Sequence, residues 1–192
     1  TLATDYLQNE GTLNNSGTVT LSGTVNNSGS LYNDGGTFTN TASGTVTQSS
    51  SAGLYNLGGT LTNAGTMTGG EYQNVVGGTW NNTGSITGAS FVFNSSTWNN
   101  AGTLATDYLQ NEGTLTSSGS VTASGQVYNL GSGSTITVTS SGSLSNSGQV
   151  DNEGTIDNAG TWTLSGLGGS LDNTGTVTNS GTLNNSGSLH ND

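Results

Sequence analysis

Residues 11–34 read GTLNNS, GTVTLS, GTVNNS and GSLYND, which is one six-residue unit repeated four times. Each unit begins with Gly followed by Thr or Ser, and its third residue is aliphatic (Leu13, Val19, Val25 and Leu31). One apolar side chain per six residues buries too little surface to offset the conformational entropy lost when a single unit is ordered. The repeat therefore predicts that the units stack on one another in a solenoid.

The same spacing continues along the whole chain. Thirty apolar anchor residues follow one another mostly at intervals of six, with longer intervals where loops are inserted. A similar corner sequence recurs after Leu31, Leu54, Tyr72 and Val127, and these anchors are always a multiple of three anchors apart. This predicts an all-β, single-stranded β-solenoid, a three-sided parallel β-helix of about ten coils, with roughly 18 residues per coil. At about 4.8 Å per strand the rod would be about 48 Å long.

Asparagine occupies a fixed place in the unit. It stands two residues after 20 of the 30 anchors, as at Asn15, Asn27 and Asn33. Because side chains alternate along a strand, a residue two places from an inward anchor also points inward. The fixed phase predicts stacked Asn amides that hydrogen-bond from one coil to the next, with Gly supplying the turn geometry.

We expect a single β-solenoid repeat domain over residues 1–192, uncapped at both ends. The segment 1–13 recurs identically at 103–115. Sixteen anchor steps separate the two copies, and sixteen is not a multiple of three. The two copies are therefore expected on different sides of the coil.

The charge balance excludes several classes of partner. The chain has 192 residues with no Lys, Arg, Pro or Cys, and its 11 acidic residues give a net charge of -11. No cation is present to neutralise phosphates, so neither nucleic acid nor an anionic membrane surface is an expected partner. No apolar run is long enough to span a bilayer, so membrane insertion is not expected either.

The side chains needed for catalysis are also scarce. With one His and no Cys, Lys or Arg, nucleophile and base pairs cannot be assembled, so we predict no enzyme and no catalytic, cofactor-binding or metal-binding residues. The acids Asp151, Glu153 and Asp172 lie close enough in the predicted coils to hold Ca²⁺ weakly. Solvated surface acids are the favoured interpretation.

The string Asn-x-Gly-Thr-aliphatic, as in residues 9–13, 63–67 and 152–156, resembles the repeats of bacterial filamentous-haemagglutinin-type adhesins and autotransporter passengers. The resemblance implies a secreted, right-handed β-helix at the cell surface that displays adhesive surface or builds a fibre of the biofilm matrix. The hexad also looks like the left-handed β-helix of hexapeptide acyltransferases, although here Thr, Asn or Tyr follows the aliphatic residue where that family commonly has Gly. We favour the right hand, the default for parallel crossovers.

Sorting the anchors by threes predicts three outer faces. One carries a double file of threonines, which resembles the ice-binding faces of β-solenoid antifreeze proteins, although Thr is also simply a good exposed β residue. Its candidate residues are Thr18, Thr20, Thr37, Thr39, Thr60, Thr62, Thr114, Thr116, Thr135, Thr137, Thr176 and Thr178.

A second face is aromatic and irregular. Its candidate residues are Tyr32, Tyr55, Phe93 and Tyr128, accompanied by Phe91 and Tyr108. Such a stripe can stack on sugars or fill an interface, and the alternative is cross-strand stacking that only stabilises the sheet. The third face, through Val25, Val46 and Met67, suggests no role.

These observations leave three hypotheses open. The first is a structural or adhesive extracellular β-solenoid, a segment or subunit of a bacterial surface fibre or giant adhesin, that associates end to end with itself. The second is an ice-binding module that uses the threonine face. The third is a β-helix that binds polysaccharide through the aromatic face.

Overall fold

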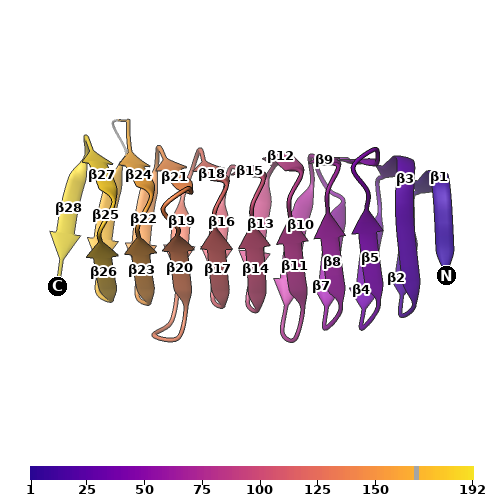
Figure 1. Ribbon diagram of the computed structural model, residues 1–192, viewed down its shortest axis with the longest axis horizontal. Helices are drawn as coiled ribbons and strands as arrows, with labels where there is room; N and C mark the ends of the chain where they lie inside the picture. The colour runs from indigo at the N-terminus through magenta and orange to yellow at the C-terminus, as the bar shows by residue number, and fades with distance from the viewer. Residues whose placement is uncertain (167–168) are drawn as a thin grey trace.

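The computed structural model describes residues 1–166 and 169–192, and in these residues the chain forms 28 β-strands and no helix. All the strand pairs are parallel and stack in a row of about ten turns, from β1 at the N-terminus to β28 at the C-terminus (Figure 1). The chain is a β-solenoid, as the hexad predicts. The right-handed winding and the three-sided outline stay predictions.

The strand pairing resolves into three ladders that run along the row. The first contains the first half of β1 (Leu2–Asn9) and of β3 (Thr18–Asn27), then β5 (Thr37–Asn40), β8 (Thr60–Asn63), β11 (Thr79–Asn82), β14 (Thr97–Asn100), β17 (Thr114–Ser117), β20 (Thr135–Val138), β23 (Thr155–Asn158) and β26 (Thr176–Asn179). The second contains the second half of β1 and β3, then β6 (Thr45–Gln48), β9 (Thr66–Thr68), β12 (Ser85–Ala89), β15 (Thr103–Thr106), β18 (Ser120–Ala123), β21 (Ser143–Asn146), β24 (Thr161–Leu164) and β27 (Thr182–Asn185). The third contains β2 (Thr12–Asn15), β4 (Ser30–Asp34), β7 (Gly53–Leu57), β10 (Glu71–Val75), β13 (Phe91–Asn94), β16 (Leu109–Asn111), β19 (Val127–Asn129), β22 (Gln149–Asn152), β25 (Ser170–Asn173) and β28 (Ser188–Asn191).

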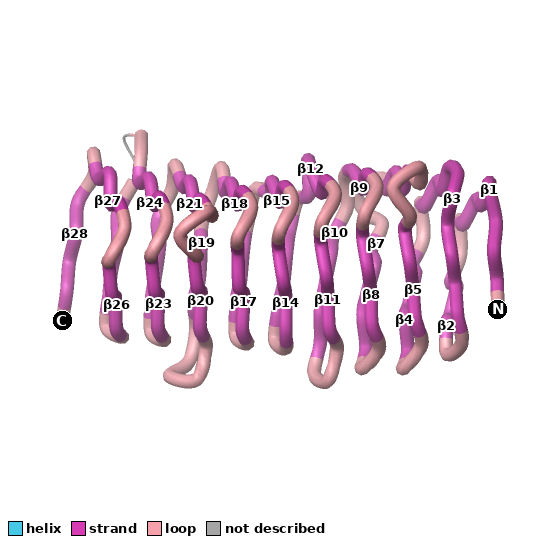
Figure 2. Tube along the Cα trace, viewed as in Figure 1, coloured by secondary structure: helices cyan, strands magenta, loops and turns pink. Residues whose placement is uncertain are grey.

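Each ladder stacks one set of anchors, in the grouping by threes that the sequence predicts. Val19 pairs with Phe38, and Phe38 pairs with Leu61. The duplicated segment changes ladder between its copies: Leu2 lies in the first ladder, whereas Leu104 lies in the second. Inserted residues bulge out as loops between the ladders, such as the loops before β11 and β20 (Figure 2), so they leave the register intact.

The core is a single hydrophobic cluster in which the stacked anchors of all three ladders meet. Val46, Leu61 and Ile86 are fully buried, and so are all three tryptophans. Trp80 and Trp98, in adjacent turns of the first ladder, stack with their ring centroids 4.4 Å apart and their planes 3° from parallel. The parallel register places like side chains one above another, and this makes face-to-face stacking of the rings possible.

The predicted Asn ladder is present and is complete in the third strand ladder. Ten Asn residues, one from each turn, form nine amide hydrogen bonds of 2.6 to 2.9 Å in which each Nδ2 donates to the Oδ1 of the next turn. These residues are Asn15, Asn33, Asn56, Asn74, Asn94, Asn111, Asn129, Asn152, Asn173 and Asn191. The same Nδ2 groups also donate to corner carbonyl oxygens, for example Asn111 to Gly113 and Thr135. Each side-chain amide therefore provides a hydrogen-bond donor to the carbonyl oxygens of the corner and also links one turn to the next.

The hexad glycines serve a different purpose from the one expected. In the described residues, positive φ angles occur only at loop and bulge glycines such as Gly58 and Gly131. At the corner, by contrast, a Cβ built on Gly102 would lie 2.0 Å from the carbonyl oxygen of Gly84 in the turn below. Glycine is needed there because stacked corners approach too closely for any side chain, and not because the turn requires a left-handed backbone.

We predict that Asn111→Ala lowers the free energy of unfolding by about 2 to 4 kcal/mol, because Asn94 and Asn129 lose a buried hydrogen-bond partner and two corner carbonyl oxygens lose a donor. The neighbouring Gln110→Ala, which removes an outward amide, is the matched control and should change stability by less than about 0.5 kcal/mol. Urea unfolding followed by circular dichroism measures both. Equal effects of the two variants would contradict a structural role for the ladder.

Tyr72 provides a pH-dependent test of the core. Its hydroxyl is buried without a hydrogen-bond partner in the described residues, its ring packs edge-on against Trp80, and burial raises its pKa well above the usual value. The folded state therefore keeps this proton after the unfolded state loses it near pH 10, so stability falls as pH rises above 10. We predict that Tyr72→Phe stabilises the protein by about 1 kcal/mol at pH 8, and that its advantage grows by about another 1 kcal/mol at pH 11.

The measurement is the urea midpoint of wild type and variant at pH 8 and pH 11. The exposed Tyr6→Phe serves as the control and should shift neither midpoint, since 59% of Tyr6 is exposed. A Tyr72→Phe advantage that is the same at both pH values would contradict the proposed titration.

Candidate binding surfaces

The threonine face, which we define as the outward residues of the first ladder, is a register-matched file over nine turns. The residue before each anchor is threonine without exception: Thr18, Thr37, Thr60, Thr79, Thr97, Thr114, Thr135, Thr155 and Thr176. Parallel pairing repeats these hydroxyl and methyl groups at about 4.8 Å along the rod, with the second file about 7 Å away along each strand. All twelve residues expected on this face lie in it.

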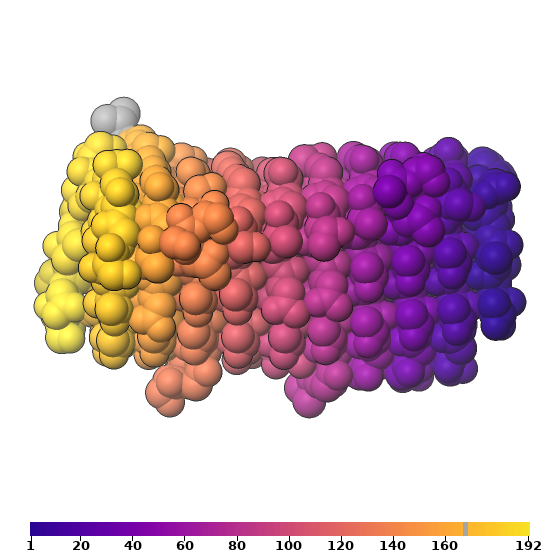
Figure 3. All heavy atoms as spheres, in the orientation of Figure 1, coloured from indigo at the N-terminus to yellow at the C-terminus, as the bar shows by residue number. Residues whose placement is uncertain are grey.

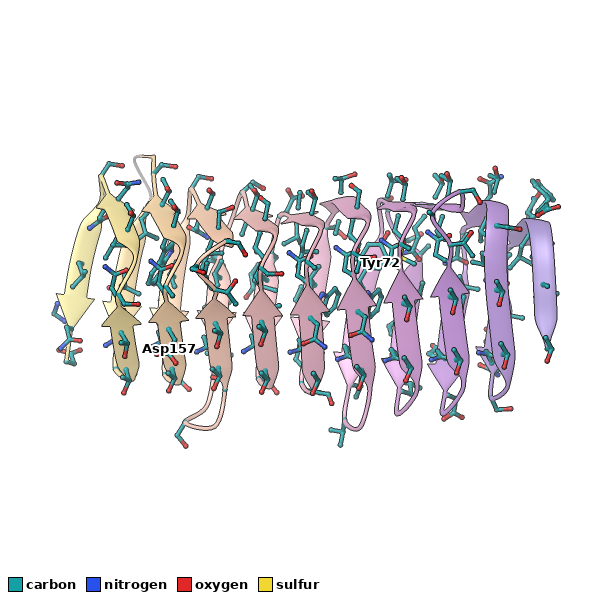
Figure 4. The ribbon with its side chains drawn as sticks, in the orientation of Figure 1. Tyr72 and Asp157 are labelled. Atoms are coloured by element: carbon teal, nitrogen blue, oxygen red, sulfur yellow. The ribbon has the colours of Figure 1, made fainter. Side chains whose placement is uncertain are left out.

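The second file of the threonine face is interrupted. After Thr20, Thr39 and Thr62 it continues with Asn81 and Asn99, whose side chains are joined by a 2.9 Å hydrogen bond. Further along, Asp157 on β23 stands between Thr137 and Thr178. Figure 4 labels this residue in the row of strands that forms the face.

Asp157 was not among the residues predicted for this face, although Thr155, Ile156 and Asp157 have the same phase in the repeat as the other triplets.

The second ladder, for which the sequence suggests no role, also carries hydroxyl groups. From β6 to β24 its outward residues are Thr, Ser and one Ala, with a single bulge near Ala89. No acid lies on this stretch. The space-filling view shows a closely packed surface along the rod (Figure 3). Two of the three ladders thus present regular, mostly uncharged hydroxyl arrays.

The aromatic side chains of the third ladder form two separate clusters. Tyr32 and Tyr55 stack on each other, with ring centroids 4.8 Å apart and planes at 19°. The next residue in register is Gln73, which separates this pair from Phe93. The expected stripe is therefore interrupted.

The second cluster, which we call the aromatic patch, contains Phe91, Phe93, Tyr108 and Tyr128. The ring centroid of Phe91 lies 6.4 Å from that of Phe93 and 5.5 Å from that of Tyr108. The ring centroids of Tyr108 and Tyr128 are 5.2 Å apart. Burial among these rings raises the pKa of the Tyr108 hydroxyl to about 12, and both the neighbouring Tyr128 and the charge of Asp151 add to the effect. The hydroxyl consequently stays neutral across the physiological range.

A hollow adjoins the aromatic patch on the side of the C-terminal turns. It is lined by Tyr128, Leu130, Asp151, Asn152, Glu153, Asp172 and Thr174. The Gln149 side-chain amide donates to two of these lining residues, to Asp151 at 2.6 Å and to Asp172 at 2.9 Å. One neutral amide thus holds together two carboxylates from adjacent turns, and no Lys or Arg exists in the chain to pair with them.

The acids do not form a metal-binding group. In residues 1–166 and 169–192 there is no cluster of three or more His, Cys, Asp or Glu side chains that could hold a metal ion. The single histidine, His190, is exposed and lies 3.1 Å from Asp192. No helix long and apolar enough to cross a membrane occurs in the part of the chain that the structure describes.

Searches against protein-family models, curated protein sequences and solved structures returned no match to this chain. The resemblance to adhesin repeats therefore stays a prediction from the motif, and function has to be argued from the surfaces themselves.

Proposed function

We propose that this chain is a structural and adhesive β-solenoid of the extracellular space or cell surface, a segment or subunit of a bacterial surface fibre or a giant adhesin. The observation that carries the proposal is the continuous parallel pairing of three ladders over about ten turns. Such a rod is held by contacts between neighbouring turns alone, so the same element can extend to any length.

The surface chemistry supports the same role. The hollows in the described surface are open and shallow, and two of the ladders present repeated hydroxyl groups rather than converging reactive side chains. Regular polar arrays suit contact with extended or repetitive surfaces. A chain without cysteine also has no thiol to be oxidised outside the cell.

The end-to-end contact follows from the strand edges. In the described structure β1 and β2 pair on one side only, and so do β26, β27 and β28. An open edge recruits further strands, which either more turns of a longer chain or a second copy can supply. Both arrangements give a longer fibre.

The proposal predicts concentration-dependent assembly of this 192-residue chain into rods. Because each copy carries a net charge of -11, assembly should strengthen as salt screens the repulsion. Leu189, which is 53% exposed in the last turn, contributes to the contact, so Leu189→Lys should weaken assembly at least tenfold. Sedimentation velocity and electron microscopy at several concentrations measure the effect.

Val76→Lys is the matched control, since Val76 is an exposed apolar residue, 78% accessible, in the loop between β10 and β11, several turns from either end. It should assemble as the wild type does. A wild type that stays monomeric at every concentration and salt would refute self-association, and a Val76→Lys variant as defective as Leu189→Lys would refute the end-to-end contact.

The unbroken threonine file of the first ladder favours ice binding as a second candidate function. We predict that the wild type shows freezing hysteresis, that Thr60→Tyr and Thr116→Tyr each reduce it at least severalfold, and that Asp157→Thr increases it by removing the charge from the array. Gln73→Tyr, on the aromatic side of the rod, is the control and should have no effect. Absence of hysteresis in the wild type would end this candidate.

A further inference from the structure

We propose that the aromatic patch and the hollow beside it form a binding site for a neutral polysaccharide. The proposal is independent of the assembly described above, because the site lies along the outside of the third ladder between β13 and β25 and does not include the open edge of β28. Phe91 and Phe93 lie on β13, Tyr108 directly precedes β16, and Tyr128 lies on β19, so the rings come from three successive turns of that ladder. The hollow is built by the next two, β22 and β25.

The rings of the patch are on the outside of the solenoid and not part of its core. They alternate with the buried anchors Val92, Leu109 and Val127, and each ring remains partly exposed. Four rings that contact one another in series make a continuous apolar ledge. Rings of this kind offer the apolar faces against which the C–H groups of a sugar pack.

Stabilisation of the sheet alone does not account for this arrangement. Where rings stabilise adjacent strands they stack directly in register, as Tyr32 does on Tyr55. Phe93, by contrast, has Gln73 and Gln110 as its register neighbours, so it has no aromatic partner across the strands. The ring plane of Tyr108 is inclined by 44° to that of Phe91 and by 42° to that of Tyr128, so these rings do not cover one another face to face.

The hollow supplies hydrogen-bond acceptors at the end of the ledge. Asp151 and Asp172 each accept one hydrogen bond from Gln149, and a carboxylate has capacity for several more. Glu153 lines the same hollow and accepts from the backbone N–H of Gly131 at 2.9 Å. A ligand that fits must donate many hydrogen bonds.

These acceptors also select the charge of the ligand. The chain has no Lys or Arg, so an anionic polymer would meet only repulsion at these carboxylates. Sugar hydroxyls, which are neutral donors, match both the carboxylates and the neutral tyrosine hydroxyls. From β13 to β25 the site covers four strand spacings, about 19 Å at about 4.8 Å each, which suits several consecutive sugar units of a polymer.

The test is affinity electrophoresis of the whole chain in native gels that contain hydroxyethyl cellulose, xyloglucan or galactomannan, with alginate as the anionic comparison. We expect at least one of the neutral polymers to retard the wild type and alginate to have no effect. Tyr128→Ala should weaken binding about tenfold, since it removes one stacking platform. Asp172→Asn, which keeps the shape but removes the charge, should weaken it severalfold.

Tyr32→Ala is the matched control, because it removes a ring of similar exposure from the same ladder outside the patch, and it should bind as the wild type does. Thermal unfolding of each variant shows that the fold is intact, and gels with EDTA and with added Ca²⁺ test for a cation. Three results would overturn the proposal: no retardation by any neutral polymer, equal binding by the wild type and a folded Tyr128→Ala, or binding that requires Ca²⁺.

Discussion

The register between successive turns is the constraint on which the whole structure depends. Each turn presents the same kind of residue at the same height, so a buried Asn finds the amide of another Asn at hydrogen-bond distance above and below it. An unpaired buried amide would cost about 1 to 3 kcal/mol. A shift of one residue would orphan the whole Asn file and turn the anchors outward, and this strongly specifies a single register.

Close stacking has the same origin. The corner glycines let the backbone of one turn approach the next closely. At Gly102 no side chain would fit, because its Cβ would lie 2.0 Å from the carbonyl oxygen of Gly84. The approach brings the corner carbonyl oxygens within reach of the interior amides, and it lets Trp80 and Trp98 stack face to face. The tryptophan indole N–H groups are left without hydrogen-bond partners in the described residues, so the packing of the rings outweighs that loss.

The same register converts a one-dimensional repeat into two-dimensional surfaces. An outward residue of one turn lies beside the corresponding residues of the neighbouring turns and forms a file with them. A single residue of a different type therefore interrupts that file. Asp157 interrupts the threonine face in this way, and Gln73 divides the aromatic residues of the third ladder into two clusters. The threonine face is a candidate binding surface because its file is regular. The aromatic patch is a candidate because the aromatic file is interrupted and its rings gather in one place.

The sequence by itself determined the solenoid and the inward Asn, because one apolar residue per unit makes the six-residue period unambiguous. The corner sequence that recurs at multiples of three anchors also determined the three-fold grouping of anchors and, with it, the change of ladder between the copies of the duplicated segment. Only the tertiary structure decided that an interior amide such as that of Asn111 reaches both the next Asn and two corner carbonyl oxygens. It also decided that Gln149 joins two carboxylates beside Tyr128, and that the glycines serve close stacking and not left-handed turns. These features depend on distances between turns that are about twenty residues apart in the sequence, and the period alone does not contain those distances.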